Sequence, residues 1–90
     1  MAFEWDEEKA AENLAKHGIP FEYATRVFDD PYHIEAEDSG FYDEIRSYAI
    51  GMVENLLLFV AFTYRQDHIR LISARKATPR ERRQYHEIST

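Results

Sequence analysis

The chain has no cysteine among its 90 residues, which excludes disulfide bonds and thiolate metal sites. It also lacks an apolar run of the roughly 18 residues needed to span a bilayer, and its longest such run is Leu56 to Phe62. Its first residues are acidic and resemble no secretory leader. Three scattered glycines are too few for a glycine-rich phosphate loop. We therefore expect a soluble cytoplasmic protein without membrane contact.

Basic side chains are scarce in the first two thirds of the chain. Residues 1–60 hold four basic and fourteen acidic side chains, whereas residues 61–90 hold seven basic and three acidic ones. The net charge of −6 argues against a polyanionic ligand, but the net +4 of the last third is compatible with a local anion site. The alternative is that these charges only solvate an uneven surface.

The remaining composition is that of a folded domain. With 44% hydrophobic and 14% aromatic residues, the chain is too apolar to be a disordered acidic segment. Its length permits one core, and we find no linker or repeat, so residues 1–90 are expected to form a single domain.

Two helices are expected first. Asp6 can cap a helix that ends at Gly18, and Pro20 suits the first turn of a second helix that ends at Asp29-Asp30-Pro31. The first helix should pack through an apolar side that consists of Ala10, Ala11, Leu14 and Ala15.

The rest of the chain predicts strands and a third helix. The expected strands are residues 32–37, 44–53, 56–64 and 69–75, with a polar break at Asp38-Ser39-Gly40, a tight turn at Glu54-Asn55 and a turn over residues 65–68. Because their connections are too short for crossovers, the sheet should be antiparallel. Thr78-Pro79-Arg80-Glu81 is a capping box, which begins a helix that runs to Tyr85 or His86. The fold class is α+β.

Cations concentrate on the last strand and the helix that follows it. They are Arg70, Arg75, Lys76, Arg80, Arg82 and Arg83. A strand that runs into a capped helix presents cations and backbone N–H groups together, which suits a phosphate. The alternative is a solvated basic helix face with ion pairs to Glu81 and Glu87.

Arg46 interrupts a strand and shares one of its faces with Tyr48, Ile50 and Met52. An arginine in that position needs a ligand or an ion pair, and the candidate partners are Glu35, Glu37 and Glu44.

Four histidines, namely His17, His33, His68 and His86, are candidates for proton transfer near neutral pH. None has the spacing of metal ligands, and the carboxylates of Asp29, Asp30 and Asp38 lie where turns are expected. We expect neither a metal ion nor another cofactor.

Three short motifs follow one another along the chain: F-x-W-D from Phe3, K-H-G from Lys16 and I-S-A-R-K-A from Ile72. Between and around them stand Lys9, Asn13, Phe21, Phe28, Asp30-Pro31, Arg46, Gly51, Thr63, Arg65, Ile69-Arg70, Glu81-Arg82 and Tyr85. Together these positions resemble the BrnT family of small toxins from bacterial type II toxin–antitoxin pairs.

The resemblance implies a fold similar to the RelE-type ribonuclease toxins. It also implies metal-independent endonucleolytic cleavage of RNA, inhibition of translation, and neutralisation by a cognate, DNA-binding antitoxin similar to BrnA. Contact with the ribosome, a homodimer or a toxin–antitoxin hetero-oligomer would be compatible with it.

The resemblance and the residue types together suggest roles in RNA cleavage. Arg46, Arg70 and Arg75 are expected to contact phosphate and the transition state, because guanidinium groups match phosphate oxygens. His17 is preferred to His68 and the tyrosines for proton transfer. Flanking phosphates are assigned to Lys16, Arg65, Lys76 and Arg82. The rival hypotheses are a binding module for nucleic acid or an acidic partner that cleaves nothing, and a purely structural assembly domain.

Overall fold

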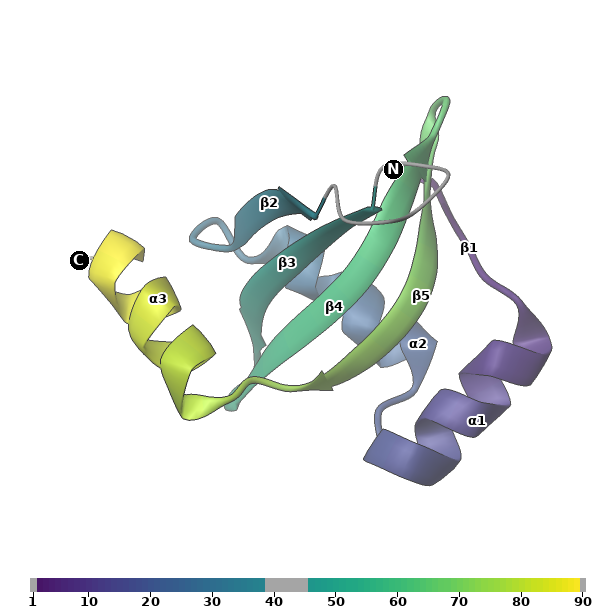
Figure 1. Ribbon diagram of the computed structural model, residues 1–90, viewed down its shortest axis with the longest axis horizontal. Coiled ribbons are helices and arrows are strands. Elements are labelled where there is room, and N and C mark those ends of the chain that lie inside the picture. The colour runs from purple at the N-terminus through teal and green to yellow at the C-terminus, as the bar shows by residue number, and fades with distance from the viewer. Residues whose placement is uncertain (1, 39–45, 90) are drawn as a thin grey trace.

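The computed structural model describes residues 2–38 and 46–89 and shows a five-stranded sheet with helices on both sides (Figure 1). The elements are β1 (Ala2–Glu4), α1 (Glu7–His17), α2 (Phe21–Ala24), the 3₁₀ helix η1 (Thr25–Asp29), β2 (Ile34–Asp38), β3 (Arg46–Val53), β4 (Leu56–Arg65), β5 (His68–Lys76) and α3 (Pro79–Ser89). The predicted α+β class is confirmed. No helix in these ranges is both long and apolar enough to cross a membrane.

The sheet differs from the expected antiparallel sheet of about four strands. Its order is β1-β5-β4-β3-β2, and β1 pairs parallel to β5, with Ala2 opposite His68 and Glu4 opposite Arg70. The prediction of an antiparallel sheet holds for the consecutive strands β2 to β5. It was wrong for β1, because short connections constrain only neighbours in sequence, and β1 reaches β5 across most of the chain.

The second helix is shorter and more irregular than predicted. Pro20 occupies the extended position before α2 and not its first turn, and the α-helix gives way to 3₁₀ geometry at Thr25. At the other end of the chain, α3 continues to Ser89, beyond the predicted Tyr85 or His86. Its capping box is confirmed: the Glu81 backbone N–H donates to Thr78 Oγ1 (3.2 Å), and the Thr78 N–H donates to the Glu81 carboxylate (2.9 Å).

Helix α1 has the predicted ends but not the predicted buried side. Asp6 caps it through two backbone N–H groups, and Gly18 ends it in the left-handed conformation at φ 74°. Asn13 is buried, whereas Leu14 is 50% exposed. The Asn13 amide donates to the Ala74 carbonyl (2.9 Å) and accepts from the Ala74 N–H (3.0 Å). At Ala74 the edge of β5 is not paired with β1, so the backbone N–H and C=O of Ala74 need other hydrogen-bond partners. Asn13 supplies both, and this need decides which side of α1 faces the sheet.

The connections from β3 to β4 and from β4 to β5 are tight turns. Glu54-Asn55 joins β3 to β4 as predicted, with Glu54 at φ 56°. Gln66-Asp67 joins β4 to β5, a shorter turn than expected. Strand β2 begins at Ile34, two residues later than predicted, since Asp30 and the residues after it form a turn closed by the His33 N–H on the Asp30 carbonyl (3.0 Å). The strand was predicted to end at Glu37, but it includes Asp38, the first residue of the predicted break. The rest of that break, Ser39-Gly40, and the predicted strand start at Glu44 lie outside the described residues.

The two faces of the sheet are covered differently. Helices α2 and η1 lie behind it in Figure 1. Their side chains Phe21 and Val27 form one buried cluster with Phe62 of β4. Gly51 allows this close approach, because a Cβ atom there would lie 2.7 Å from a Val27 methyl group. On the other face, Tyr85 of α3 packs against Ile50 and Leu57 at one end only. We call the remainder of this second face the open face.

Candidate functional site

The open face receives a side chain from every second residue of β3 and β4. Two cross-strand rows define it, Tyr48–Ala61–Ser73 and Ile50–Phe59–Arg75. Further along the strands, Thr63 lies opposite Arg70, and Arg46 stands two residues before Tyr48 on the same face. The structure therefore brings Arg46, Arg70 and Arg75 to one face of the sheet.

A bulge in β5 is the reason that Arg70 and Arg75 share this face. They are five residues apart, so strict alternation would place them on opposite faces. The register shifts at Ala61/Phe62, where Leu71 pairs with Phe62 and Ser73 with Ala61, which leaves Ile72 as the extra residue.

Arg75 is held by three neighbours. Its Nη1 and Nη2 atoms donate to the two Glu81 carboxylate oxygens at 2.8 and 3.0 Å, and Nη1 also donates to the Lys76 carbonyl (3.2 Å). The guanidinium carbon lies 4.2 Å from the centroid of the Phe59 ring, a cation–π contact. Burial raises the pKa of Glu81, but the hydrogen bonds from Arg75 and Thr78 outweigh burial and lower that pKa below its ordinary value. Glu81 is thus a fixed anion beside Arg75.

Aromatic rings extend this arrangement across the open face. Tyr48 stacks on Phe59 with ring centroids 5.0 Å apart and an interplanar angle of 19°. The Tyr48 hydroxyl accepts a long hydrogen bond from the Gln84 amide (3.5 Å). Tyr48 is only partly buried, so part of its ring is accessible to a planar group, with Phe59 between that ring and the Arg75 guanidinium.

Arg70 and Arg46 stand farther from α3. Arg70 Nη1 lies 3.7 Å from the Glu4 carboxylate of β1, which also lies 3.1 Å from His68 Nε2. Arg46 is half-buried and faces Asp38 of β2 in the strand register. Both side chains remain partly accessible, so their charges contribute to the potential over the open face.

His17 and Lys16 lie at the margin of the open face, on the last turn of α1. They line a surface hollow of about 240 Å³ between α1 and β5, together with Lys9, Glu12, Asn13, Ile72 and Ser73. Ser73 lines this hollow and is also part of the open-face row Tyr48–Ala61–Ser73. It stands two residues before Arg75 on the same face of β5. At about 3.3 Å per residue, the hollow begins roughly 7 Å along β5 from Arg75.

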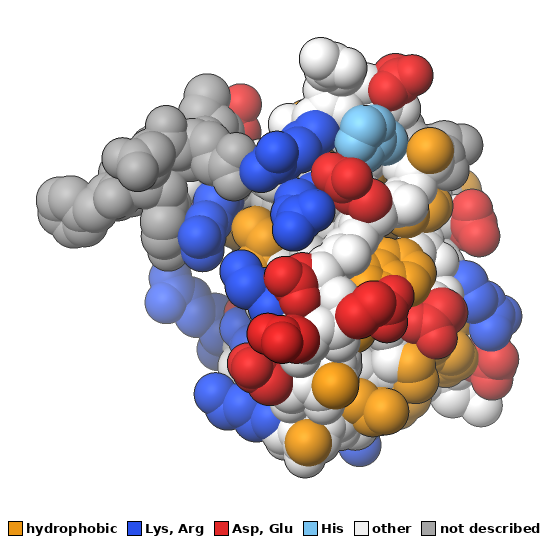
Figure 2. All heavy atoms as spheres, turned by 90° about the vertical axis from the view of Figure 1, so that its right-hand side faces the viewer, with side chains coloured by type: hydrophobic (Ala, Val, Ile, Leu, Met, Phe, Trp, Pro, Cys, Tyr) orange, Lys and Arg blue, Asp and Glu red, His pale blue; other side chains and the backbone are white. Residues whose placement is uncertain are grey.

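The other predicted site residues are spread over the length of the sheet. Arg65 pairs with His68 at the β4–β5 turn, whereas Lys76 ends β5 and Arg82 is exposed on α3. The eight-residue step from His68 to Lys76 corresponds to about 26 Å. Figure 2 looks toward the β1–β5 edge and shows Lys and Arg side chains gathered along its left, the side of the open face, with acidic side chains nearer the centre.

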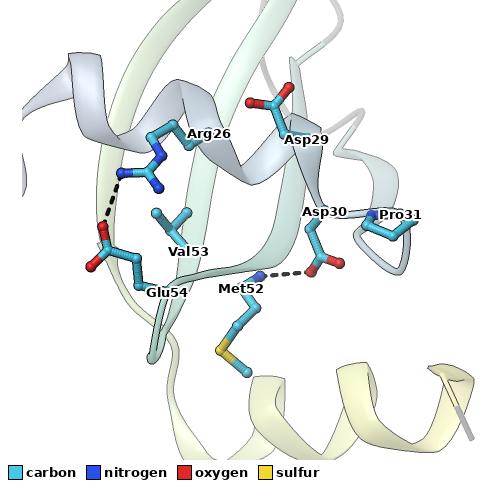
Figure 3. Close-up of a pocket in the computed structure, with 7 residues that line it drawn as sticks. All are labelled: Arg26, Asp29, Asp30, Pro31, Met52, Val53 and Glu54. Atoms are coloured by element: carbon cyan, nitrogen blue, oxygen red, sulfur yellow. Dashed lines mark hydrogen bonds and ion pairs between the residues drawn. The ribbon is translucent and has the colours of Figure 1, made fainter.

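A second surface pocket carries more carboxylates than cations, since Arg26 is the one cation among its described lining residues, which include Asp29, Asp30 and Glu54. It measures about 380 Å³ and lies between η1 and the β3–β4 turn, where Arg26 and Glu54 point toward each other and pair at 3.1 Å (Figure 3). Asp30 accepts from the Met52 N–H (2.8 Å) and from the Tyr85 hydroxyl (2.6 Å). Burial and this hydrogen bond raise the pKa of Tyr85 to about 12. The pocket therefore ties α3 to the sheet and has no surplus cation.

His33 forms a separate polar chain with Glu35 and Tyr64. Its Nδ1 lies 2.8 Å from the Asp30 carbonyl and its Nε2 lies 2.8 Å from Glu35, whose other oxygen accepts from the Tyr64 hydroxyl. Both ring nitrogens face acceptors, which favours the imidazolium. Burial lowers the pKa of His33, but Glu35 and Asp30 outweigh it and raise that pKa above 6.5.

The hydrogen bonds of His33 predict that the stability of the protein depends on pH. A folded-state pKa above the unfolded value means that the stabilising contribution of His33 is fully present below about pH 6.5 and is lost as the pH rises through the folded-state pKa. Urea unfolding at several pH values between about 5.5 and 8.5 measures this contribution to the free energy of unfolding. We expect the stability difference between wild type and His33→Gln to shrink with rising pH. A difference that stays constant would contradict the assignment.

Sequence reasoning did not identify Ser73 and Phe59 as neighbours of the predicted site residues. It also missed the contact between Glu81 and Arg75. Ser73 was noted only as part of the I-S-A-R-K-A motif and was given no role, and the bulge that orients Ser73 and Arg75 leaves no sequence signal. Glu81 was identified as a capping residue, and its pairing with a cation was considered only for the helix surface. Within residues 2–38 and 46–89, no group of three or more His, Asp or Glu side chains is placed to hold a metal ion.

Comparison with protein families gives one match. A family described as the ribonuclease toxin BrnT of type II toxin–antitoxin systems matches residues 5–81. This range contains α1, the whole of β2 to β5 and the beginning of α3 with Glu81. The resemblance seen in the sequence motifs is thereby confirmed. Comparison with curated proteins gives no match.

Proposed function

The chain belongs to the BrnT family of ribonuclease toxins of type II toxin–antitoxin systems, and on that premise we propose that its open face cleaves RNA without a metal ion. The observation that supports this most strongly is the convergence of Arg46, Arg70 and Arg75 on one accessible face beside a stacking surface. Single-stranded RNA needs both features, since its phosphates bind cations and its bases stack on aromatic rings.

RNA carries its own nucleophile, which makes a metal-free route chemically sufficient. A base on the protein takes the proton of a 2′-hydroxyl, and the oxygen attacks the adjacent phosphorus. The P–O5′ bond then breaks, and the leaving 5′-oxygen receives a proton. The products are a 2′,3′-cyclic phosphate and a 5′-hydroxyl end. Between these steps the phosphate carries extra negative charge, which fixed cations stabilise.

Arg75 is proposed to contact the phosphate that reacts, because its guanidinium is already oriented by Glu81 and Phe59. Tyr48 offers its partly exposed ring to a neighbouring base. Arg70 and Arg46 lie farther along the strands, where they would bind the phosphates on one side of the cleaved bond and stabilise its charge.

His17 is proposed to transfer protons from the α1 side of the open face. Its hollow shares Ser73 with the row beside Arg75, and Lys16 stands next to it to hold a flanking phosphate. Lys76 and Arg82 would bind phosphates toward α3, and Arg65 those toward the β4–β5 turn. The path of RNA would then follow the length of β5.

The family has an RNA target and an antitoxin partner. We propose that a DNA-binding, BrnA-like antitoxin neutralises this chain by covering the open face, as a toxin–antitoxin hetero-oligomer. We further propose that residues 1–90 act as one RelE-like domain in the cytoplasm, and that cleavage inhibits translation, with the ribosome as a possible site of action. The pairing of β1 with β5 supports the single domain, since it joins the first strand of the chain to the last.

A second candidate is a binding module that holds RNA without cleaving it. It is supported by Arg46, Arg70 and Arg75 themselves, because cations hold a polyanion through charge alone and need no proton transfer. The net charge of −6 and the carboxylates of Glu81 and Glu4 beside two of these arginines predict that such binding is weak and sensitive to salt.

Expression in a bacterial host separates these candidates. We expect induction of the chain to arrest growth and to fragment total RNA, and co-expression of a cognate antitoxin to restore growth. Soluble protein that leaves growth and RNA intact would contradict the toxin function and favour the binding module.

A further inference from the structure

Arg75 has N–H donors that its protein partners leave available. A guanidinium carries five N–H groups. Three of those on Arg75 are used: both Nη1 hydrogens, by Glu81 and the Lys76 carbonyl, and one Nη2 hydrogen, by Glu81. No acceptor within residues 2–38 and 46–89 takes the Nε–H or the second Nη2–H. These two bonds are parallel and lie on the same side of the guanidinium, so they form the second of its two forks.

Glu81 is well placed to fix the direction of that fork. Its carboxylate is only 16% exposed and takes both Arg75 hydrogen bonds in one plane. The same carboxylate accepts from the Thr78 N–H, and its backbone N–H donates to the Thr78 hydroxyl. Phe59 covers one surface of the guanidinium. The arginine is thus oriented before any ligand arrives.

We propose that Glu81 is a positioning residue for RNA cleavage, which holds Arg75 so that its Nε–H and second Nη2–H bind two oxygens of the phosphodiester on the open face. The inference rests on the proposed ribonuclease function. It also assigns the ion pair a role beyond capping α3, because a capping carboxylate has no need of a bidentate arginine.

The proposed role predicts which kinetic constant changes. Glu81 carries a negative charge that repels the substrate, and this repulsion offsets what the oriented fork adds to ground-state binding. Glu81 keeps the fork oriented toward the phosphate while negative charge develops there. This orientation stabilises the transition state more than the bound substrate. Loss of the Glu81 carboxylate should therefore lower kcat and leave KM nearly unchanged.

The chain offers a matched pair of variants for the test. Glutamine at position 81 keeps the capping box but can accept only at one oxygen, so Glu81→Gln removes the bidentate contact to Arg75. Thr78→Ala removes the cap on the Glu81 N–H and leaves the Arg75 contact in place. We expect Glu81→Gln to lower kcat about tenfold with KM within about twofold. Thr78→Ala should lower the melting temperature and keep the wild-type kcat.

Two outcomes of this comparison would overturn the inference. One is a Glu81→Gln variant that cleaves RNA at the wild-type rate. The other is a loss of activity that is equal in both variants, which would mean that only the stability of α3 matters. In either case RNA cleavage by wild type would still support the proposed function.

A second measurement does not depend on cleavage. A 2′-O-methyl RNA oligonucleotide lacks the nucleophile, and its binding can be followed by the ¹⁵N–¹H NMR signal of Arg75 Nε. We expect this signal to shift on titration in wild type and to shift less in Glu81→Gln. An unchanged Nε signal in wild type would overturn the inference. A shifted signal in a protein that cleaves no RNA would overturn the ribonuclease function and leave the fork assignment standing.

Discussion

Replacement of Arg75 by alanine is expected to lower kcat/KM for RNA cleavage about 10²- to 10³-fold, the usual effect of removing one donor that stabilises a developing anion. The geometry of the Arg75 side chain is fixed by the Glu81 carboxylate and the Phe59 ring. The measurement is steady-state cleavage of an RNA oligonucleotide by purified protein. A variant that cleaves at the wild-type rate would remove Arg75 from the site.

Two controls separate charge, geometry and folding in this experiment. Arg83→Ala removes an equal charge from an exposed position on α3 and should cleave normally. Arg75→Lys keeps the charge but loses both forks, so it should remain close to the alanine variant. Because Arg75→Ala leaves the Glu81 carboxylate without its partner, a loss of stability of about 1–3 kcal/mol is expected, and rates should be compared well below the melting temperature.

Replacement of Asn13 by alanine is expected to lower the free energy of unfolding by about 3 kcal/mol. Asn13 is buried, and its amide satisfies the N–H and C=O of Ala74 and the carbonyl of Ile19. Alanine would leave these backbone groups without partners, at a cost of about 1–3 kcal/mol for each group that water does not reach. Urea unfolding measures the change.

Leu14 provides the matched control for Asn13 on the same helix. It is 50% exposed, so Leu14→Ala should change the stability by no more than about 0.5 kcal/mol. The sequence pattern alone predicts a larger effect of Leu14→Ala, because it places Leu14 on the side of the helix that packs. A larger loss in Leu14→Ala than in Asn13→Ala would contradict the observed orientation of α1.

Local signals predicted the parts of the fold that depend on neighbouring residues. The Asp6 cap, the left-handed Gly18, the Glu54-Asn55 turn and the Thr78–Glu81 capping box all act within a few residues, and all four are present. Strands β3 to β5 followed from their apolar pattern. Strand β1 could not be predicted in this way, since three residues before a helix show no periodicity and are fixed only by the distant edge of β5.

The sequence allowed the candidate site residues to be proposed by type, but it did not reveal how they are arranged. The alternation of β3 placed Arg46 beside Tyr48 on one face, as observed. The same rule separates Arg70 from Arg75, and only the extra residue Ile72 brings them together. Asn13 shows a similar limit, since its role depends on Ala74, which is 61 residues away in sequence.

The most direct test of the central claim is incubation of the purified chain with an RNA oligonucleotide in excess EDTA, beside the same oligonucleotide with a single 2′-deoxy nucleotide at the cleaved position. The account predicts cleavage of the RNA in EDTA, a 2′,3′-cyclic phosphate on the upstream product, and no cleavage at the 2′-deoxy position. Cleavage that stops in EDTA, or that continues at the 2′-deoxy position, would contradict it.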